Sequence, residues 1–355
     1  MDKKSVLVGV SGGVDSTVAA CKLIAEGYHV EGLYIDNGYP SRAISDAADA
    51  CDKINIPLHT INVAHAFRES VVDYFVSEYA AGRTPNPCAV CNKLIKFKYL
   101  LEEADRHGFF HIATGHYCRI EYDDLRGIFS LLRGVDTKKD QSYFLFCLGQ
   151  KELSRLLFPN GNNTKEEIMA LSLAEGFGSK SHMESQEICF IPDNDYRCFI
   201  ESYTTDNPFI HGDIVTLQGK VVGRHRGIHS VTIGQRRGLN IASERPYYVY
   251  SIDTIHNRVV VARDEEQWCR GLSASGVSWT DPDFWKNTPL RVFTCIRYRH
   301  KGVLASITPL TEDRRRVTVT FDSPQKAVAP GQAVVFYDCD RVLGGGWIEE
   351  VIRHA

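Results

Sequence analysis

The chain has 355 residues, of which 43% are hydrophobic and 24% charged, and its formal net charge is −3. A chain of this length is expected to form two or three domains with sizeable cores. It has no apolar run of membrane-spanning length and no signal peptide, and its eleven cysteines are too scattered for a disulfide scaffold. We therefore expect a cytoplasmic protein with reduced thiols.

The charge is unevenly distributed along the chain. Residues 1–200 carry 21 Lys and Arg against 27 Asp and Glu, whereas residues 201–355 carry 20 against 17. The basic excess therefore lies in the second part of the chain, which is where contacts with a polyanion are expected.

The first predicted element is a buried parallel strand, Val6–Val10, followed by Ser-Gly-Gly-Val-Asp-Ser at 11–16 and a helix from Ser16 to Ala25. Unpaired N–H groups and the positive end of the helix dipole meet at such a turn and form an anion site. The turn lacks the lysine of a Walker-type loop and the third glycine of a dinucleotide fingerprint. Asp15 would repel a phosphate unless Mg²⁺ lies between them. We interpret the turn as an ATP–Mg²⁺ site from which pyrophosphate leaves; a simple connecting turn is the alternative.

Strands and helices alternate through the next hundred residues. Strands are expected at 29–35, 58–63 and 110–114, and helices at 41–54, 65–81, 93–107 and, further on, 141–175 and 193–203. This alternation predicts a parallel α/β sheet covered on both faces. Ligands bind at the carboxyl ends of such strands, so Ile35 and Gly115 should face the same crevice as the glycine turn. Both fit an adenosine pocket, although Ile35 is equally well explained as a core residue.

After Gly212 the pattern changes to short alternating runs separated by turn residues, which is typical of a β-barrel or sandwich. Strands are expected at 213–217, 247–252, 258–262, 290–296, 316–321 and 333–337. Boundaries are expected near 205–211 and, less clearly, near 272–288. We therefore predict three domains: an α/β catalytic domain at 1–208, a small β-rich central domain at 209–272 and a C-terminal β-barrel at 273–355.

A second informative stretch is Thr84-Pro-Asn-Pro-Cys88-Ala-Val-Cys91. Its two prolines stiffen the loop, and the following helix with its lysines should lower the pKa of the thiols. A zinc knuckle lacks a second close cysteine pair here, and a thioredoxin-like redox site lacks its βαβ unit. A thiol that acts on an adenylated substrate best suits an ATP loop. Cys189, in Ser-Gln-Glu-Ile-Cys-Phe-Ile (185–191), would on its own be taken for a core cysteine.

Together these motifs resemble a known family. The turn at 11–16 resembles the PP-loop of the ATP pyrophosphatase superfamily, whose members adenylate a substrate oxygen. The cysteine loop at 84–92, Ala-Thr-Gly-His-Tyr at 113–117, Lys-Asp-Gln-Ser-Tyr-Phe-Leu at 139–145 and the Cys189 motif follow in an order that closely resembles the bacterial tRNA-specific 2-thiouridylases. The similarity continues in segments 232–238, 296–299 and 330–332, so it covers nearly the whole chain.

The resemblance implies a PP-loop α/β domain of the adenine nucleotide hydrolase type with a parallel sheet, then a mostly β central domain and a C-terminal β-barrel. It implies a tRNA-uridine 2-sulfurtransferase that adenylates O2 of the wobble uridine, position 34. Persulfide sulfur on Cys189 then reaches C2, either directly or as hydrosulfide released when Cys91 attacks. A Cys91–Cys189 disulfide is one end point, which must then be reduced. The implied partners are the tRNA anticodon arm and a cysteine desulfurase or sulfur-relay protein, with no membrane.

The resemblance also assigns residues. Cys91 is implied as nucleophile, Cys189 as persulfide carrier and Asp15 as a contact of Mg²⁺–ATP. The implied ATP site consists of Gly9, Val10, Ser11, Gly12, Gly13, Val14, Asp15, Ser16, Ile35 and Gly115. The implied contacts with the target base are Asn86, Pro87 and Cys88, and those with the rest of the tRNA are His116, Lys139, Asp140, Gln141, Arg297, Tyr298 and Gln332.

Three alternatives stay open. Some members of the family have an acidic residue in place of Cys88, and the extra thiol would allow Cys88, Cys91 and Cys189 to hold a [4Fe–4S] cluster. A PP-loop amide-forming ligase would need an ammonia source, and no glutaminase nucleophile is evident. A non-catalytic RNA-binding or sulfur-carrier protein would not need the intact ATP loop.

Three basic segments lie in the second part of the chain: Lys220–His229 with Arg236 and Arg237, Arg297–Lys301, and Arg314–Arg316. The first two mix arginine with histidine or tyrosine, which suits phosphate contacts and stacking on unpaired bases. A solvated basic face is the alternative for each, and the preferred one for the third. We expect this part to hold the anticodon arm while the wobble base is turned out of its stack.

Overall fold

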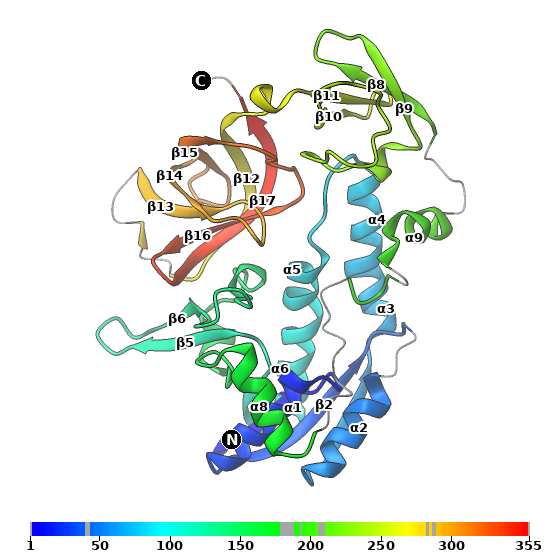
Figure 1. Ribbon diagram of the computed structural model, residues 1–355. Coiled ribbons are helices and arrows are strands. Elements are labelled where there is room, and N and C mark those ends of the chain that lie inside the picture. The colour runs from blue at the N-terminus through cyan, green and yellow to red at the C-terminus, as the bar shows by residue number, and fades with distance from the viewer. Residues whose placement is uncertain are drawn as a thin grey trace.

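The computed structural model describes residues 2–39, 43–177, 188–191, 194–204, 210–281, 284–285 and 289–353. They form an α/β domain, a small central β domain and a C-terminal β-barrel in chain order, as the sequence predicts (Figure 1). The predicted boundary at 208/209 and the first two residues of the helix predicted at 41–54 lie outside the described residues. No helix within the described ranges is long and apolar enough to cross a membrane.

The α/β domain is built on a parallel sheet of five strands in the order β3-β2-β1-β4-β7. The strands are β1 (Asp2–Gly9), β2 (His29–Asp36), β3 (Leu58–Asn62), β4 (Phe109–Ala113) and β7 (Leu156–Leu157). In the central strand, Val6, Leu7 and Val8 are fully buried, because helices cover both faces of the sheet. The parallel sheet expected from the apolar runs is confirmed.

Helices α1 (Val14–Ala25) and α2 (Ala43–Lys53) cover one face of this sheet, where they pack around Val8. On the other face, Leu100 of α6 (Phe97–His107) packs against Leu7. Helix α8 (Lys165–Ala174) lies against α1, with Ile168 beside Val18 in a shared cluster. The start of α1, where the glycine turn lies, is thereby supported by a second helix.

Two longer helices each contain a π-helical turn, a feature frequent at functional sites. One runs from α3 (Ala64–Phe67) through the π-turn Arg68–Val72 into α4 (Asp73–Ala80). The other runs from α5 (Pro87–Cys91) through the π-turn Asn92–Lys96 into α6. The helix predicted at 93–107 therefore begins earlier, at Pro87. Cys88 and Cys91 lie inside its first turns rather than ahead of it.

The region from 114 to 175 differs from the prediction of a helix at 141–175. Strands β5 (Cys118–Asp123) and β6 (Ile128–Arg133) form an antiparallel hairpin, and only Ser142–Phe144, α7 (Gln150–Leu153) and α8 are helical. β6 pairs with β17 (Arg341–Ile352), so the hairpin extends the sheet of the barrel. Its partner is distant in sequence, and local patterning therefore could not reveal it. The helix predicted at 193–203 is confirmed as α9 (Tyr196–Tyr203).

The central domain is a sheet of four strands in the order β10-β11-β8-β9, around a small core that includes Val249, Val259 and Val261. The strands are β8 (Gly212–Thr216), β9 (Val221–His225), β10 (Tyr248–Asp253) and β11 (Arg258–Ala262). Figure 1 shows this domain beyond the end of α4, beside α9. Of its strands, only β9, within the basic segment, was not expected.

The C-terminal barrel has the strand order β12-β15-β14-β13-β16-β17 and closes through β12–β17 pairing. Its strands are β12 (Cys269–Trp279), β13 (Leu290–Cys295), β14 (Val303–Pro309), β15 (Val317–Gln325), β16 (Ala333–Asp338) and β17. The predicted boundary at 272/273 falls inside β12, whose small residues resemble a linker. They are small because strands approach closely: a Cβ on Gly271 would lie 2.3 Å from the Val319 carbonyl oxygen.

The barrel and the α/β domain share one hydrophobic core. A single cluster of buried side chains contains Leu7 and Ile112 of the parallel sheet, Phe146 of the connecting segment and Tyr337 of the barrel. In Figure 1 the barrel, drawn from yellow to red, lies beside α5 and above the β5–β6 hairpin. The barrel is therefore held against the part of the α/β domain that carries the cysteine loop.

Candidate active site

The glycine turn links the carboxyl end of β1 to α1 and is fixed by its own side chains. Ser16 Oγ donates to the Gly13 carbonyl (3.0 Å) and accepts from Ser11 N–H (3.1 Å). Gly12 has φ of +77°, and a Cβ there would lie 2.7 Å from Asp46 Cβ, so only glycine fits. Gly13 supplies no side-chain cap to α1. The first amides of the helix are thus uncapped by a side chain and suit an anion.

Gly115, which follows β4, lies directly against this turn. A Cβ on Gly115 would lie 2.5 Å from the Asp15 carbonyl carbon and 2.6 Å from Ser16 N. Asn160 Nδ2 donates to the carbonyls of both Asp15 (2.8 Å) and Gly115 (3.3 Å) and holds the two segments together. The close backbone approach expected at Gly115 therefore exists, and the segment that Gly115 approaches is the glycine turn.

Ile35 is half-buried and packs against two core clusters. It can therefore still be either a core residue or part of an adenosine pocket.

The Asp15 carboxylate faces a cation that the sequence analysis did not identify. Lys165 Nζ lies 2.7 Å from Asp15 Oδ1, and the Tyr117 hydroxyl donates to the same oxygen at 2.6 Å. Lys165 lies 150 residues away, in the first turn of α8, and no local signal connects the two. Because Lys165 offsets the charge of Asp15, the turn can approach a polyphosphate with less repulsion. The residues around the turn therefore fit a nucleoside triphosphate.

Cys91 lies at the end of α5, is 9% exposed, and belongs to the cluster of apolar side chains beneath the cysteine loop. Burial raises its pKa to about 12, and the charge of Lys96 only partly opposes this. Desolvation likewise raises the pKa of Cys88 and Cys189, although both residues are exposed. The expectation of lowered thiol pKa values is therefore wrong, because desolvation outweighs the helix terminus and the lysines.

Lys96 ends the π-turn that follows Cys91, and it is the cation common to the three thiols. Its charge lowers the pKa of Cys88, Cys91 and Cys189 alike. In return, the thiolates raise the pKa of Lys96 against the effect of desolvation. Lys96 also acts on His116, whose pKa falls to about 3, mainly through burial. In the sequence, Lys96 is only one of several lysines in the helix that follows the cysteine loop, and the π-turn that orients it cannot be recognised there.

Cys189 is exposed, so the alternative that it is a core cysteine is wrong. The buried residue is its neighbour Phe190, whose ring centroid lies 5.6 Å from that of Phe67 and 5.4 Å from that of Phe75. Phe190 shares this cluster with Cys91. Asn37, just past β2, places its amide nitrogen 4.0 Å from Cys189 Sγ. Through Phe190, this cluster holds the Cys189 segment against the same group of apolar side chains to which Cys91 belongs.

All eleven cysteines lie in the described part of the chain, and each is a free thiol. Within the described ranges, no three His, Cys, Asp or Glu side chains are grouped so that they could hold a metal ion. In this conformation Cys88, Cys91 and Cys189 therefore do not fit a [4Fe–4S] cluster.

The residues assigned to the target base differ in exposure. Asn86 and Pro87 are buried, and Asn86 Oδ1 caps α5 by accepting from Ala89 N–H at 3.2 Å. Cys88 is exposed. His116, which the resemblance assigns to the rest of the tRNA, has its Nδ1 atom 2.7 Å from Thr114 Oγ1. Of the three residues assigned to the target base, Cys88 is therefore the exposed one.

The residues assigned to the rest of the tRNA also fall into two sets. Arg297 is exposed, Lys139 is partly exposed, and Tyr298 packs against Phe144 with 4.6 Å between ring centroids. By contrast, Gln141 Oε1 accepts from Tyr117 N–H (3.0 Å). Gln332 and Asp140 also make internal hydrogen bonds, described below. Internal contacts thus account for part of the set that the resemblance assigns to RNA.

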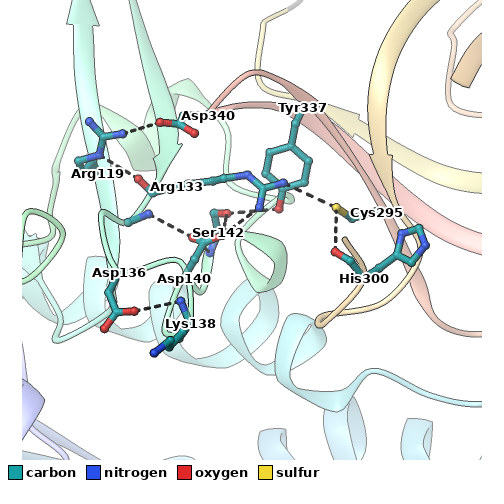
Figure 2. Close-up of polar contacts among 11 residues, drawn as sticks. Arg119, Arg133, Asp136, Lys138, Asp140, Ser142, Cys295, His300, Tyr337 and Asp340 are labelled. Carbon is teal, nitrogen blue, oxygen red and sulfur yellow. Dashed lines mark hydrogen bonds and ion pairs between the residues drawn. The ribbon is translucent and has the colours of Figure 1, made fainter. Parts of the chain in front are cut away.

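Asp140 lies at the centre of a polar network between the domains (Figure 2). Its Oδ1 accepts from the N–H groups of Gly134 (3.2 Å) and Ser142 (3.0 Å), and its Oδ2 accepts from Ser142 Oγ (2.9 Å). Arg133 lies 3.7 Å from Oδ2 and over the Tyr337 ring, 3.9 Å from its centroid. Asp140 therefore orients an arginine against the barrel.

The basic segment of the central domain is only partly available to a ligand. His225 and His229 are buried and contact Asn257 and Glu201, so the expectation that these histidines stack on bases is wrong. Arg224 and Arg226 are exposed. Nearby, a cavity of about 310 Å³ is lined by residues 236–241, 243 and 245–247, three of them arginines. Arginine, not histidine, is the RNA-compatible feature of this domain.

Comparison with known proteins places the chain in a family. Three family models follow one another along it: "tRNA methyl transferase HUP domain" at 4–193, "tRNA methyl transferase PRC-barrel domain" at 197–263 and "Aminomethyltransferase beta-barrel domain" at 269–348. A Syntrophus aciditrophicus protein named tRNA-specific 2-thiouridylase MnmA 2 is 49% identical over 339 residues, which is 91% of this chain and 99% of that protein. The chain belongs to the tRNA-specific 2-thiouridylase family.

Further relatives of this family match the sequence of this chain over almost their whole length. The tRNA-specific 2-thiouridylases MnmA of Chlorobium phaeobacteroides and Syntrophotalea carbinolica are 44% and 45% identical. They cover 99% and 97% of this chain and 99% and 98% of their own lengths. The family and the fold class inferred from the motifs are therefore confirmed. The individual residue roles stay predictions.

Proposed function

We propose that this protein is a tRNA-uridine 2-sulfurtransferase that consumes ATP and converts the wobble uridine to 2-thiouridine. The observation that supports this most directly is that two cysteines from distant segments lie near the carboxyl ends of the parallel strands. The Asn37 amide nitrogen, just past β2, lies 4.0 Å from Cys189 Sγ, and the glycine turn follows the neighbouring strand β1. Cys91 and Phe190, the neighbour of Cys189, share one cluster, and Lys96 acts both on the thiols and on His116 after β4. The proposed nucleotide site and the two thiols would therefore lie at the same edge of the sheet.

The proposed reaction begins at the uridine. O2 attacks the α-phosphorus of ATP, pyrophosphate leaves, and C2 becomes electrophilic because its oxygen is now part of a good leaving group. The terminal sulfur of a Cys189 persulfide attacks C2 and AMP leaves; Cys91 thiolate then attacks the Cys189 sulfur and the S–S bond breaks. 2-Thiouridine and a Cys91–Cys189 disulfide result, and a thiol reductant restores both cysteines. In the alternative order, Cys91 attacks first and the released hydrosulfide adds to C2.

The residues of the site contribute charge and position. The uncapped amides of α1 would hold the phosphates, with Asp15 contacting Mg²⁺ and Lys165 offsetting the carboxylate. Lys96 would favour the thiolate and persulfide anions that the reaction needs, against the burial that disfavours them. The anticodon arm would meet exposed arginines such as Arg297 and Arg224. A cysteine desulfurase or relay protein would load Cys189, in the cytoplasm.

The test is thiolation of unmodified tRNA by purified full-length protein with ATP, Mg²⁺, cysteine and a cysteine desulfurase. Cys189→Ser and Cys91→Ser should each abolish 2-thiouridine formation and leave tRNA affinity unchanged. Cys198→Ser is the matched control, because Cys198 is also an exposed free thiol, on α9. Thiolation by the Cys189→Ser protein would remove the persulfide role. AMP formation that needs an amine rather than tRNA would instead favour an amide-forming ligase.

A further inference from the structure

A turn of the barrel, Pro330–Gln332, contacts the segment that precedes the cysteines. Thr84 N–H donates to the Pro330 carbonyl at 2.8 Å. The Gln332 side-chain amide donates to the carbonyls of Thr84 (3.1 Å) and Pro85 (2.8 Å). Three hydrogen bonds therefore join the barrel to the cysteine loop across almost 250 residues of sequence.

The cysteine loop needs this support because it can make few backbone bonds of its own. Pro85 and Pro87 have no N–H group, and residues 82–86 belong to no helix or strand. The side chain of Asn86 is already used to cap α5. Pro85 is buried, so its carbonyl would be costly to leave without a donor. The Gln332 amide supplies that donor.

The fit between turn and loop is tight on both sides. Gly331 is buried at φ of +90°, and a Cβ there would lie 2.8 Å from the Thr84 carbonyl oxygen. Arg83, just before the loop, is paired with Glu78 of α4 (2.8 Å) and with Glu349 of β17 (2.8 Å). The barrel therefore holds residues 83–85 through a backbone hydrogen bond, the Gln332 side-chain amide and an ion pair.

We infer that the Pro330–Gln332 turn is a positioning element that fixes the cysteine loop so that Cys91 meets the sulfur on Cys189. Gln332 acts through the carbonyls of the loop and is a positioning residue, not a catalytic one. The barrel is thus a structural part of the sulfur-transfer site as well as a surface for RNA. This inference rests on the proposed function for its kinetic consequences, but not for its structural ones.

The test compares Gln332→Ala and Gln332→Glu with wild type in the full chain. The glutamate keeps the shape of the side chain, but when ionised it has no hydrogen to donate to the carbonyls of Thr84 and Pro85. Gln150→Ala is the matched control, because Gln150 Nε2 also donates to two carbonyls, those of Phe129 and Thr280, and also joins the α/β part to the barrel, away from the cysteines. The readouts are the alkylation rate of Cys91 by iodoacetamide, measured by mass spectrometry, the tRNA affinity, and kcat and KM for thiolation.

Both Gln332 variants should alkylate Cys91 at least about fivefold faster than wild type and Gln150→Ala, because the loop opens more often. Their kcat for thiolation should fall at least about tenfold, since small misplacements of reacting atoms are costly, while KM and Kd for tRNA change less than about threefold. Alkylation no faster than in Gln150→Ala would overturn the inference. So would a loss of tRNA affinity that matches the loss of kcat/KM, which would make Gln332 an RNA contact. If the wild-type protein makes no 2-thiouridine, the proposed function fails, whereas the alkylation comparison still decides the positioning role.

Discussion

Replacing Asp140 by alanine should weaken the contact between the α/β domain and the barrel. Asp140 is 8% exposed, accepts three hydrogen bonds from Gly134 and Ser142, and lies 3.7 Å from Arg133. Arg133 in turn contacts Tyr337 and Cys295 of the barrel. The substitution therefore removes the acceptor that orders residues 134–142 and the charge that orients Arg133.

The magnitude follows from these contacts. A hydrogen bond to a charged group contributes about 1.5–3 kcal/mol, and breaking a buried ion pair costs about 3–5 kcal/mol. Because the Arg133 side chain is 26% exposed and the terms overlap, we expect Asp140→Ala to lower the unfolding free energy by about 3 kcal/mol. Asp140→Asn should lose only about 1 kcal/mol, since its oxygen still accepts from both amides and its nitrogen can donate to Ser142 Oγ. Burial raises the pKa of Asp140, so removing its charge also relieves a cost present at neutral pH.

The assay is urea unfolding of both variants at neutral pH, followed by near-ultraviolet circular dichroism, with tRNA affinity measured on the folded proteins. The reasoning is refuted if Asp140→Ala unfolds at the wild-type urea concentration. Equal destabilisation by alanine and asparagine would also contradict it. A variant that keeps its stability but loses tRNA affinity would show that Asp140 contacts RNA.

Four further predictions concern the nucleotide turn and the thiols. Gly115→Ala places a Cβ 2.5 Å from the Asp15 backbone, so tRNA-dependent AMP formation should fall at least about a hundredfold at unchanged tRNA affinity, and normal AMP formation would contradict the close approach. Because the pKa of Cys91 is about 12, its alkylation should accelerate about tenfold per pH unit between about pH 6 and 9. Lys96→Met should slow alkylation about tenfold at each pH, and an unchanged rate would exclude Lys96 as its cation. Cys88→Ser should retain at least about half of the thiolation rate, because only Cys91 and Cys189 exchange sulfur in the proposed reaction. A full loss, with iron and labile sulfide in the wild-type protein, would support the cluster.

Local signals predicted the parts of the fold whose reasons are local. The parallel strands were evident because burial on both faces makes runs such as Val6–Val10 continuously apolar. The β5–β6 hairpin was missed because its strands mix charged and apolar residues and because β6 pairs with β17, far along the chain. β12 and β17 were missed because their glycines resemble linkers. A Cβ on Gly345 would lie 2.6 Å from the Val334 carbonyl oxygen, so glycine there reflects close strand packing.

The candidate site likewise contains features that are local in sequence and features that arise only from contacts between distant segments. The glycine turn, the cysteine loop and the Cys189 motif are each one continuous stretch of sequence, so each could be located from the sequence alone. Lys165 beside Asp15, Phe190 in the cluster with Cys91, and Gln332 on the cysteine loop are contacts between distant segments, and only the fold reveals them. The thiol pKa values were predicted in the wrong direction because sequence shows nearby charge but not burial.

The most direct test of the central claim is mass analysis of tRNA nucleosides from cells with and without the gene for this protein. We predict that wobble 2-thiouridine disappears without the gene and returns with the wild-type gene, but not with a gene encoding Cys189→Ser. Undiminished wobble 2-thiouridine in the deleted strain, in the absence of a second enzyme of this family, would contradict the account.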